Sequence, residues 1–227
     1  MRKYCPPSEP FLSEVYKDTS ILVLNKPSGL LSVPGRDPAN KDSLASRVQQ
    51  RYSEALIVHR LDMDTSGLVV MARGPEIHRK LSTLFQNREV NKTYLARVWG
   101  VPEAESGEVN LPLICDWPNR PRQKVDFEVG KPSLTYWEKV SISESSSLIR
   151  LKPVTGRSHQ LRVHMQAIGH PILGDPFYAS SEALSAAPRL LLHANELDFD
   201  HPDTGEKLHF SIPLPVSFSA GQERAYF

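Results

Sequence analysis

Short runs of apolar residues, separated by polar turns, indicate a protein built largely from β-strands. The run Ile21-Leu-Val-Leu-Asn25 ends in Lys26-Pro27-Ser28-Gly29, which is typical of a buried strand followed by a turn. Further strands are expected at 68–71, 93–99, 125–129, 134–142 and 148–154. A hairpin is expected between 189–199 and 207–212, because Asp203-Thr204-Gly205 suits a tight turn.

Three segments have the patterns of helices. Ser43 is a suitable N-cap for a helix over 44–52, and Pro75 can occupy the first turn of a second helix. The apolar residues that fall on one face of this second helix are Ile77, Leu81, Leu84 and Phe85. A third helix is expected over 158–168. Together the patterns predict an α+β protein with a mainly antiparallel sheet and flanking helices and loops.

The length of 227 residues, 40% of them hydrophobic, allows one sizeable core or two small ones. The chain has no internal repeat, and no run rich in Gly, Ser or Pro separates two domains. We therefore expect an N-terminal extension at 1–14 and one domain at 15–213. The tail at 214–227 lacks a pattern and is expected to be loose.

The composition excludes several classes of protein. No apolar stretch is long enough for a secretory signal or a spanning helix, which predicts a cytoplasmic protein without a membrane partner. The only cysteines, Cys5 and Cys115, exclude a disulfide framework and a four-cysteine zinc site. His159 and His164 are five residues apart and do not share a helical face, so no metal site is predicted.

Two segments hold several positive charges and no acid, although the net charge of +1 is low for a nucleic-acid-binding domain. The segment 150–164 has four cations and no acid: Arg150, Lys152, Arg157 and Arg162. The segment 117–124 combines Trp117 with Arg120, Arg122 and Lys124. This second composition suits phosphate contacts and base stacking in single-stranded RNA, but it is also that of an ordinary solvated loop.

The main candidate for chemistry is the polar segment His59-Arg-Leu-Asp-Met-Asp-Thr-Ser-Gly67. An extended backbone would place Arg60 and Asp62 on one side of this segment. A carboxylate can act as a nucleophile or a base, but Arg-x-Asp alone is more typical of a surface turn with a local ion pair. Other segments have to decide between these interpretations.

Two later segments favour chemistry: Lys92-Thr-Tyr94-Leu-Ala-Arg-Val-Trp-Gly100 and Gly156-Arg-Ser-His-Gln-Leu-Arg162. With the segment 59–67 they resemble the RluA family of pseudouridine synthases, whose loop reads His-Arg-Leu-Asp-x-x-Thr-Ser-Gly. Further blocks similar to this family lie at 25–35, 111–120, 169–175 and 189–194. The block Trp117-Pro-Asn-Arg120 is most similar to the member that acts on both ribosomal RNA and transfer RNA.

The resemblance implies that the chain isomerises uridine to pseudouridine in structured RNA, without a cofactor. It assigns the catalytic aspartate to Asp62, the active-site tyrosine to Tyr94 and the basic partner to Arg162. It also implies that Arg60 fills the space left by a flipped nucleotide. On these grounds RNA contacts are expected from Arg60, His59, Trp117, Arg120, Arg122, Lys124, Arg157 and His159. Many relatives carry a small RNA-binding domain in front; this chain is expected to lack one and to act as a monomer.

Structural interpretations of the same residues stay open. A tyrosine at position 94 of a predicted strand would ordinarily belong to the core. Arg162 could be a solvated residue on a helix whose buried face holds Leu161, Met165 and Ile168.

Two other functions also stay open. Asp62 and Asp64 could form a carboxylate pair that hydrolyses a glycosidic bond with water. Alternatively, the chain could be a non-catalytic RNA-binding module with the same fold. Release of free uracil would identify the hydrolase, and a single-turnover assay would identify the inactive module.

Overall fold

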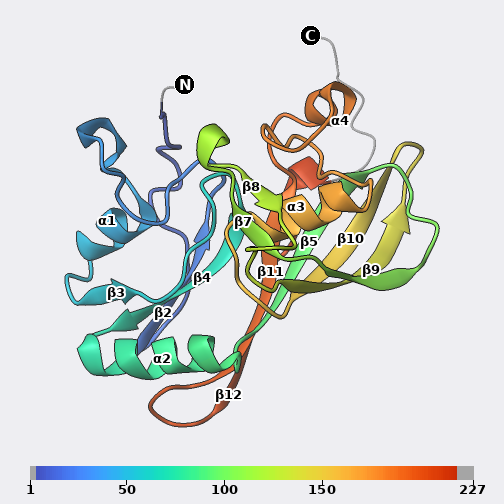
Figure 1. Ribbon diagram of the computed structural model, residues 1–227. Coiled ribbons are helices and arrows are strands. Elements are labelled where there is room, and N and C mark those ends of the chain that lie inside the picture. Colours follow the sequence, from blue (N-terminus) through green and yellow to red (C-terminus); the bar gives the residue numbers. More distant parts are fainter. Residues whose placement is uncertain (1–3, 219–227) are drawn as a thin grey trace. The chain divides into compact units, whose positions relative to one another are not determined.

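The computed structural model describes residues 4–218, which divide into two compact units (Figure 1). Unit 1 contains residues 4–93 and 194–212, and unit 2 contains residues 94–193 and 213–218. The chain enters unit 2 within strand β5 (Asn91–Trp99) and returns within strand β11 (Leu192–Asp200). Both crossings fall inside strands, which explains why no linker is visible in the sequence.

Unit 1 is built on a sheet with the strand order β1–β2–β4–β11, in which β3 pairs with β4 and β12 with β11. The pairings β1–β2, β2–β4, β3–β4 and β11–β12 are antiparallel. The strands are β1 (Glu14–Lys17), β2 (Ile21–Lys26), β3 (Ala55–Ile57), β4 (Ser66–Arg73) and β12 (Lys207–Ser211). The helices are α1 (Leu44–Gln49), α2 (Pro75–Asn87) and the short 3-10 helix η1 (Pro38–Asn40).

Helix α2 covers one face of this sheet (Figure 1). Ile77 and Leu81 are buried against sheet residues, and Leu84 and Phe85 pack partly on the same cluster, as the spacing predicts. Pro75 opens the helix as expected. The expected cap of α1 is also present, because the Ser43 side chain accepts a hydrogen bond from the Ser46 backbone N–H.

Gly67 allows a close approach between two strands of unit 1. Its φ is +118°, and a Cβ at this position would lie 2.3 Å from the carbonyl oxygen of Ala194 in β11. Any other residue would therefore force β4 away from β11. This contact explains why glycine ends the polar segment 59–67.

Unit 2 contains a sheet with the order β5–β10–β9–β6, in which all three pairings are antiparallel, and a separate antiparallel hairpin of β7 and β8. The strands are β6 (Ser106–Asn110), β7 (Leu113–Cys115), β8 (Gln123–Val125), β9 (Leu134–Ile142) and β10 (Ser146–Pro153). The helices are α3 (Gln160–Ala167), α4 (Ser181–Ser185), and the 3-10 helices η2 (Trp117–Asn119) and η3 (Val216–Phe218). Leu161 and Met165 of α3 pack into the core of this unit with Ile149 and Leu151 of β10.

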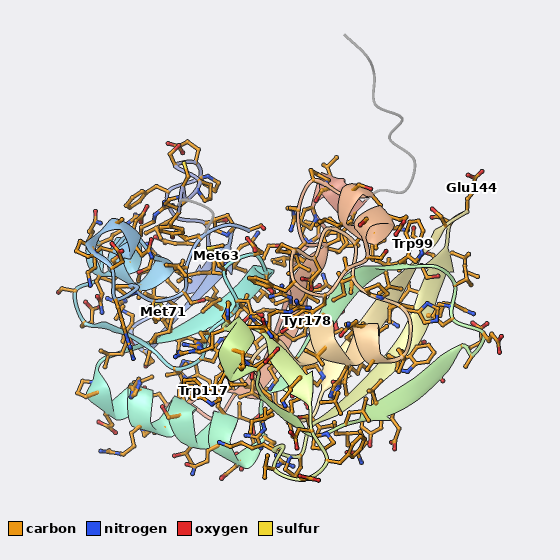
Figure 2. All side chains as sticks on the ribbon, turned by 45° about the horizontal axis from the view of Figure 1, so that its top comes forward. Met63, Met71, Trp99, Trp117, Glu144 and Tyr178 are labelled. Carbon is orange, nitrogen blue, oxygen red and sulfur yellow. The ribbon has the colours of Figure 1, made fainter. Side chains whose placement is uncertain are left out.

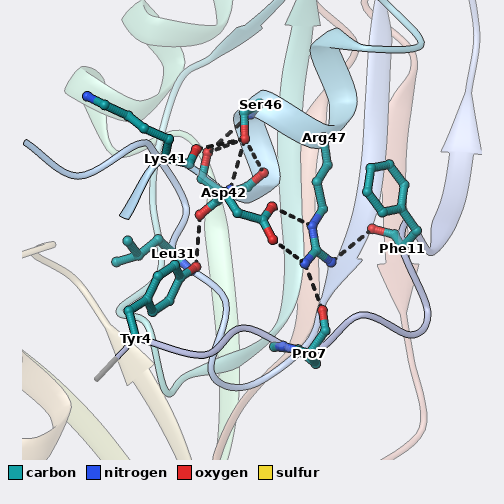
Figure 3. Close-up of polar contacts among 9 residues, drawn as sticks. Tyr4, Pro7, Phe11, Leu31, Lys41, Asp42, Ser46 and Arg47 are labelled. Carbon is teal, nitrogen blue, oxygen red and sulfur yellow. Dashed lines mark hydrogen bonds and ion pairs between the residues drawn. The ribbon is translucent and has the colours of Figure 1, made fainter. Parts of the chain in front are cut away.

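The segment before β1 is anchored to unit 1 through Arg47, a buried residue of α1 (Figure 3). The guanidinium donates to both carboxylate oxygens of Asp42 at 2.7 Å, and to the carbonyl oxygens of Pro7 at 2.7 Å and Phe11 at 3.3 Å. The Tyr4 hydroxyl adds a bond to the Asp42 carbonyl oxygen at 2.9 Å. The described part of this segment is therefore packed onto unit 1.

Three expectations about secondary structure need correction. The strand expected at 125–129 ends at Val125, because the Asp126 carboxylate accepts hydrogen bonds from the backbone N–H groups of Glu128 and Val129 and forms a turn. The helix expected at 44–52 ends at Gln49. The tail is not loose where it is described, because Phe218 is buried in the core of unit 2; residues 219–227 lie outside the described part.

Candidate active site

The loop that carries Asp62 is fixed through its backbone by the turn that follows β2. The Ser32 hydroxyl donates to the Leu61 carbonyl oxygen at 2.7 Å and accepts from the Leu61 N–H at 3.1 Å. The Ser28 hydroxyl donates to the Asp64 carbonyl oxygen at 2.7 Å. Asp62 itself is half-buried between these two anchored residues. Its backbone position is therefore set on both sides.

Lys26 also connects the turn after β2 to the Asp62 loop. Its side chain is fully buried, and the ammonium donates to the carbonyl oxygens of Pro27, Leu30 and Met63 at 3.0, 2.7 and 3.0 Å. A buried ammonium requires such acceptors, because desolvation would otherwise strongly disfavour its charge. The lysine of the Lys26-Pro27-Ser28-Gly29 turn thus supports the Asp62 loop, a role that the sequence pattern alone did not indicate.

His59 is held as a neutral ring at the start of the loop. Its Nε2 accepts a hydrogen bond from the Val70 N–H at 3.0 Å, and the ring stacks on Phe85 with 4.5 Å between centroids. Burial, and secondarily the charge of Lys92, lower the pKa of His59 to about 3. His59 therefore carries no positive charge near pH 7, and any contact it makes with RNA does not depend on one.

Arg60, the next residue, is exposed. Within residues 4–218 it makes no hydrogen bond or ion pair. The surface turn with a local Arg60–Asp62 ion pair is therefore absent, and the guanidinium is available to a ligand.

Arg162 is not a solvated helix residue, because its side chain is only 2% exposed. Its Nε and Nη2 donate to the two carboxylate oxygens of Asp175 at 2.8 and 2.7 Å. The guanidinium also lies over the rings of Phe177 and Tyr178, at 5.3 and 5.2 Å from their centroids. The Nε–Nη2 edge of the guanidinium group is thus fixed by a buried bidentate ion pair.

Tyr178 connects Arg162 to two other expected site residues of unit 2. Its hydroxyl accepts from the Gln123 N–H at 2.8 Å and lies 2.6 Å from Nδ1 of His159. Arg122 lies over the same ring at 5.5 Å. Tyr178 is buried within the packed side chains of the unit, whereas Glu144 projects from the tip of the β9–β10 hairpin (Figure 2). The structure therefore brings Arg122, His159 and Arg162 around one tyrosine.

The cationic segment 117–124 forms the tip and second strand of the β7–β8 hairpin. Trp117 is 67% exposed, and Arg120 lies over its ring at 4.6 Å. Lys124 differs from the two arginines, because it pairs with Asp126 at 3.5 Å. The surface that is free for an anion therefore depends mainly on Arg120 and Arg122.

The remaining expected residues are also in unit 2. Tyr94 of β5 is partly buried against the core, in line with its simpler structural interpretation. Arg157 is exposed at the start of the α3 region, and its Nε donates to the Pro132 carbonyl oxygen at 3.3 Å. Arg150 pairs with Glu138 at 2.7 Å, so the segment 150–164 is less free of acids than its sequence suggests.

Sequence reasoning missed three residues that shape these groups: Lys26, Asp175 and Tyr178. The first two are buried charges, and a charged residue inside an otherwise apolar or turn-forming block was the only signal for them. Residues 4–218 contain no group of three or more His, Cys, Asp or Glu side chains that could hold a metal ion. No helix in this described part is both long and apolar enough to cross a membrane.

Comparison with known proteins agrees with the motifs. Residues 20–167 match the family described as RNA pseudouridylate synthase. The dual-specificity RNA pseudouridine synthase RluA of Escherichia coli (strain K12) is 56% identical over 214 residues, which cover 94% of this chain and 98% of the relative. RluA of Vibrio parahaemolyticus is 52% identical over 234 residues, covering 100% of this chain and 92% of the relative.

Solved structures show the same fold. The human RNA pseudouridylate synthase domain containing 1 has a TM-score of 0.75 and 29% identity, covering 89% of this chain and 83% of that protein. The human domain containing 4 has a TM-score of 0.73 and 25% identity, covering 90% and 89%. These matches confirm the α+β fold and the family that the sequence motifs predict.

Proposed function

The chain belongs to the RNA pseudouridylate synthase family, and from this premise we propose that it isomerises uridines of ribosomal RNA and transfer RNA with Asp62 as the catalytic carboxylate. The observation that carries the proposal is the fixed loop. Hydrogen bonds from Ser28 and Ser32 hold the backbone on either side of Asp62. Catalytic groups gain from such fixed placement, because little ordering remains to be done when the substrate binds.

The reaction breaks the bond between C1′ of the ribose and N1 of the base, rotates the base, and joins C1′ to C5. The hydrogen on C5 is lost as a proton and N1 gains one, so the atoms balance without a cofactor. The Asp62 carboxylate can serve by attacking an electrophilic carbon, by stabilising a cationic sugar or by taking a sugar proton. All three roles require the ionised carboxylate.

Tyr94 and Arg162 are proposed as the other two catalytic residues. A tyrosine offers a ring face for stacking on the detached base, and this suits the interval between bond breaking and rejoining. Arg162 supplies a permanent positive charge, whose orientation is supported by the bonds to Asp175. Both roles rest on the positions of these residues in the family motifs.

The RNA contacts are proposed to come from two sets of residues. Arg60 and His59 belong to the Asp62 loop, and the other contacts belong to unit 2: Trp117, Arg120, Arg122, Lys124, Arg157 and His159. An exposed tryptophan beside exposed arginines supports base stacking and phosphate binding in unpaired RNA. We further propose a monomer that acts in the cytoplasm, with residues 15–213 as its catalytic domain.

The deciding experiment compares Asp62→Asn with Asp64→Asn. The amide at position 62 keeps the shape of the side chain but removes its charge and nucleophilicity, so turnover should be lost while RNA affinity is kept. Asp64 is its matched control, because it lies in the same loop and its backbone carbonyl, not its carboxylate, accepts the bond from Ser28. Pseudouridine is measured in a target RNA hairpin, and free uracil is measured in the same samples.

Three outcomes would contradict the proposal. Activity of Asp62→Asn within about tenfold of wild type, roughly 1.4 kcal/mol of barrier, would remove its catalytic role. Free uracil with loss of activity in both variants would favour a hydrolase that uses Asp62 and Asp64 together. RNA binding without any turnover by the wild type would identify a non-catalytic module.

A further inference from the structure

Lys92 is a half-buried residue whose charge acts on His59 at the start of the Asp62 loop. It lies in β5, and its Nζ is 5.9 Å from the centre of the Phe85 ring. Burial lowers the pKa of Lys92, which means that the surroundings disfavour its charged form. Within residues 4–218 the ammonium has neither a carboxylate partner nor a hydrogen-bond acceptor. In the described part of the chain, the Phe85 ring is therefore the one protein group shown to face this charge.

His59, whose pKa is affected by Lys92, does not provide a negative charge. The His59 ring stacks on Phe85, the same ring that Lys92 contacts. The Nε2 of His59 already accepts a hydrogen bond from the Val70 N–H. The charge of Lys92 contributes to lowering the pKa of His59. The ammonium thus lies over the Phe85 ring, on which the neutral His59 ring also stacks, and its charge disfavours protonation of the imidazole.

We propose that Lys92 binds a phosphodiester group of the substrate RNA beside the target nucleotide. An incompletely solvated cation gains most from a ligand that supplies both negative charge and hydrogen-bond acceptors, and a phosphodiester supplies both. The place fits the target nucleotide, because the neighbouring His59 stands three residues before Asp62 in the anchored loop. This assignment rests on the proposed function, since it takes RNA as the substrate.

A packing role is the alternative, in which the aliphatic part of Lys92 simply covers the ring of Phe85. The two roles predict different effects of Lys92→Met on RNA binding. This substitution keeps an unbranched apolar side chain and removes the charge. If Lys92 binds phosphate, the free protein loses a disfavoured charge, so its unfolding temperature stays constant or rises while RNA binding weakens. If Lys92 only packs, RNA binding is unaffected.

The test measures the dissociation constant for one RNA hairpin between about 50 mM and about 200 mM salt. Lys80→Met is the matched control, because Lys80 is a lysine of the same unit whose ammonium is already paired with Glu76 at 3.2 Å. Lys92→Met should weaken binding about tenfold at the lowest salt and reduce the salt slope by about 0.7, the value for one phosphate contact in a single strand. Lys80→Met and the charge-preserving Lys92→Arg should keep the wild-type slope.

Equal slopes for Lys92→Met and wild type would overturn the proposal. So would a slope that decreases as much in Lys80→Met, because the effect would then be one of net charge alone. Pseudouridine formation by the wild type on the same hairpin is measured in parallel. A wild type that binds the hairpin but makes no pseudouridine refutes the proposed function. The difference in salt slope between Lys92→Met and wild type then still tests whether Lys92 binds phosphate.

Discussion

Asp175 fixes the guanidinium of Arg162 through two hydrogen bonds, from Nε at 2.8 Å and from Nη2 at 2.7 Å. Both side chains are buried, and the same carboxylate also accepts from the backbone N–H groups of Phe177 and Tyr178. The orientation of Arg162 therefore depends on the segment that follows residue 174 as much as on its own helix.

Asp175→Asn should reduce turnover strongly and also destabilise unit 2. It removes the negative charge that Asp175 places against the buried Arg162 guanidinium, and breaking a buried ion pair in this way costs about 3–5 kcal/mol. Asp42→Asn provides the control, because Asp42 holds the buried Arg47 of unit 1 with the same two-bond geometry. Turnover per folded molecule is measured below the unfolding temperature of both variants. Equal residual turnover would show that Asp175 acts only on stability.

Within the β7–β8 hairpin, Arg120 and Arg122 should make the main phosphate contacts and Lys124 a weaker one. Replacing Arg120 and Arg122 by Gln should reduce the salt slope of RNA binding by about 1.4, at about 0.7 for each contact. Lys124→Gln should add little, because Lys124 already pairs with Asp126. Turnover at saturating RNA should survive in all variants. An unchanged slope in the double variant would identify the hairpin as an ordinary solvated loop.

Arg60→Ala should impair modification of a uridine in a hairpin loop without disturbing the fold. Arg60 is exposed and has no partner within residues 4–218, so its loss breaks no internal contact. Extruding a base costs a few kcal/mol and least where the base is unpaired, and a planar guanidinium can stack in the gap. One RNA with its uridine in the loop or in the stem provides the measurement. Equal rates on both forms would rule out the loop preference and the wedge role.

His59 should make the free energy of unfolding fall in acid. Its pKa is about 3 in the folded protein against about 6.5 in an unfolded chain. Between these values only the unfolded chain takes up the proton, so the stability present above pH 6.5 is lost as the pH falls, by at most about 1.4 kcal/mol per pH unit. Denaturant unfolding of His59→Gln, which keeps an acceptor, should show a shallower dependence.

His209→Gln is the control for this pH series, because the pKa of His209 is shifted in the opposite direction from that of His59. Asp198 raises the pKa of the exposed His209, so any stability from that pair is present at low pH and is lost as the pH rises. His209→Gln should therefore leave the acid-side slope unchanged. An acid-side slope in His59→Gln equal to that of the wild type would show that His59 titrates normally.

Local patterns were sufficient to predict the helices α1, α2 and α3 and the longer strands, but not the short helix α4 or the strands β1, β3, β6 and β7. Pro75 and the apolar spacing behind it identified α2, because both signals act within one element. The strand expected at 125–129 was wrong since one carboxylate, Asp126, captures two backbone N–H groups, and propensity does not register this competition.

The sequence motifs predicted which residues belong to the candidate site, but not the contacts that hold them in place. The resemblance identified Asp62, Tyr94 and Arg162, whose roles stay predictions. The partnership of Arg162 with Asp175 joins residues thirteen apart, on a helix and in a loop, and no rule of local spacing indicates it. The burial of Lys26 was hidden for the same reason, because its acceptors are carbonyl groups, which every residue possesses.

The anchoring of the Asp62 loop by carbonyl groups has a consequence for divergence among descendants of this chain. Lys26, Ser28 and Ser32 contact the main chain at Met63, Asp64 and Leu61, and a substitution at 63 or 64 leaves those oxygens in place. The side chains that follow the carboxylate can therefore change over evolution while the backbone that positions Asp62 is kept.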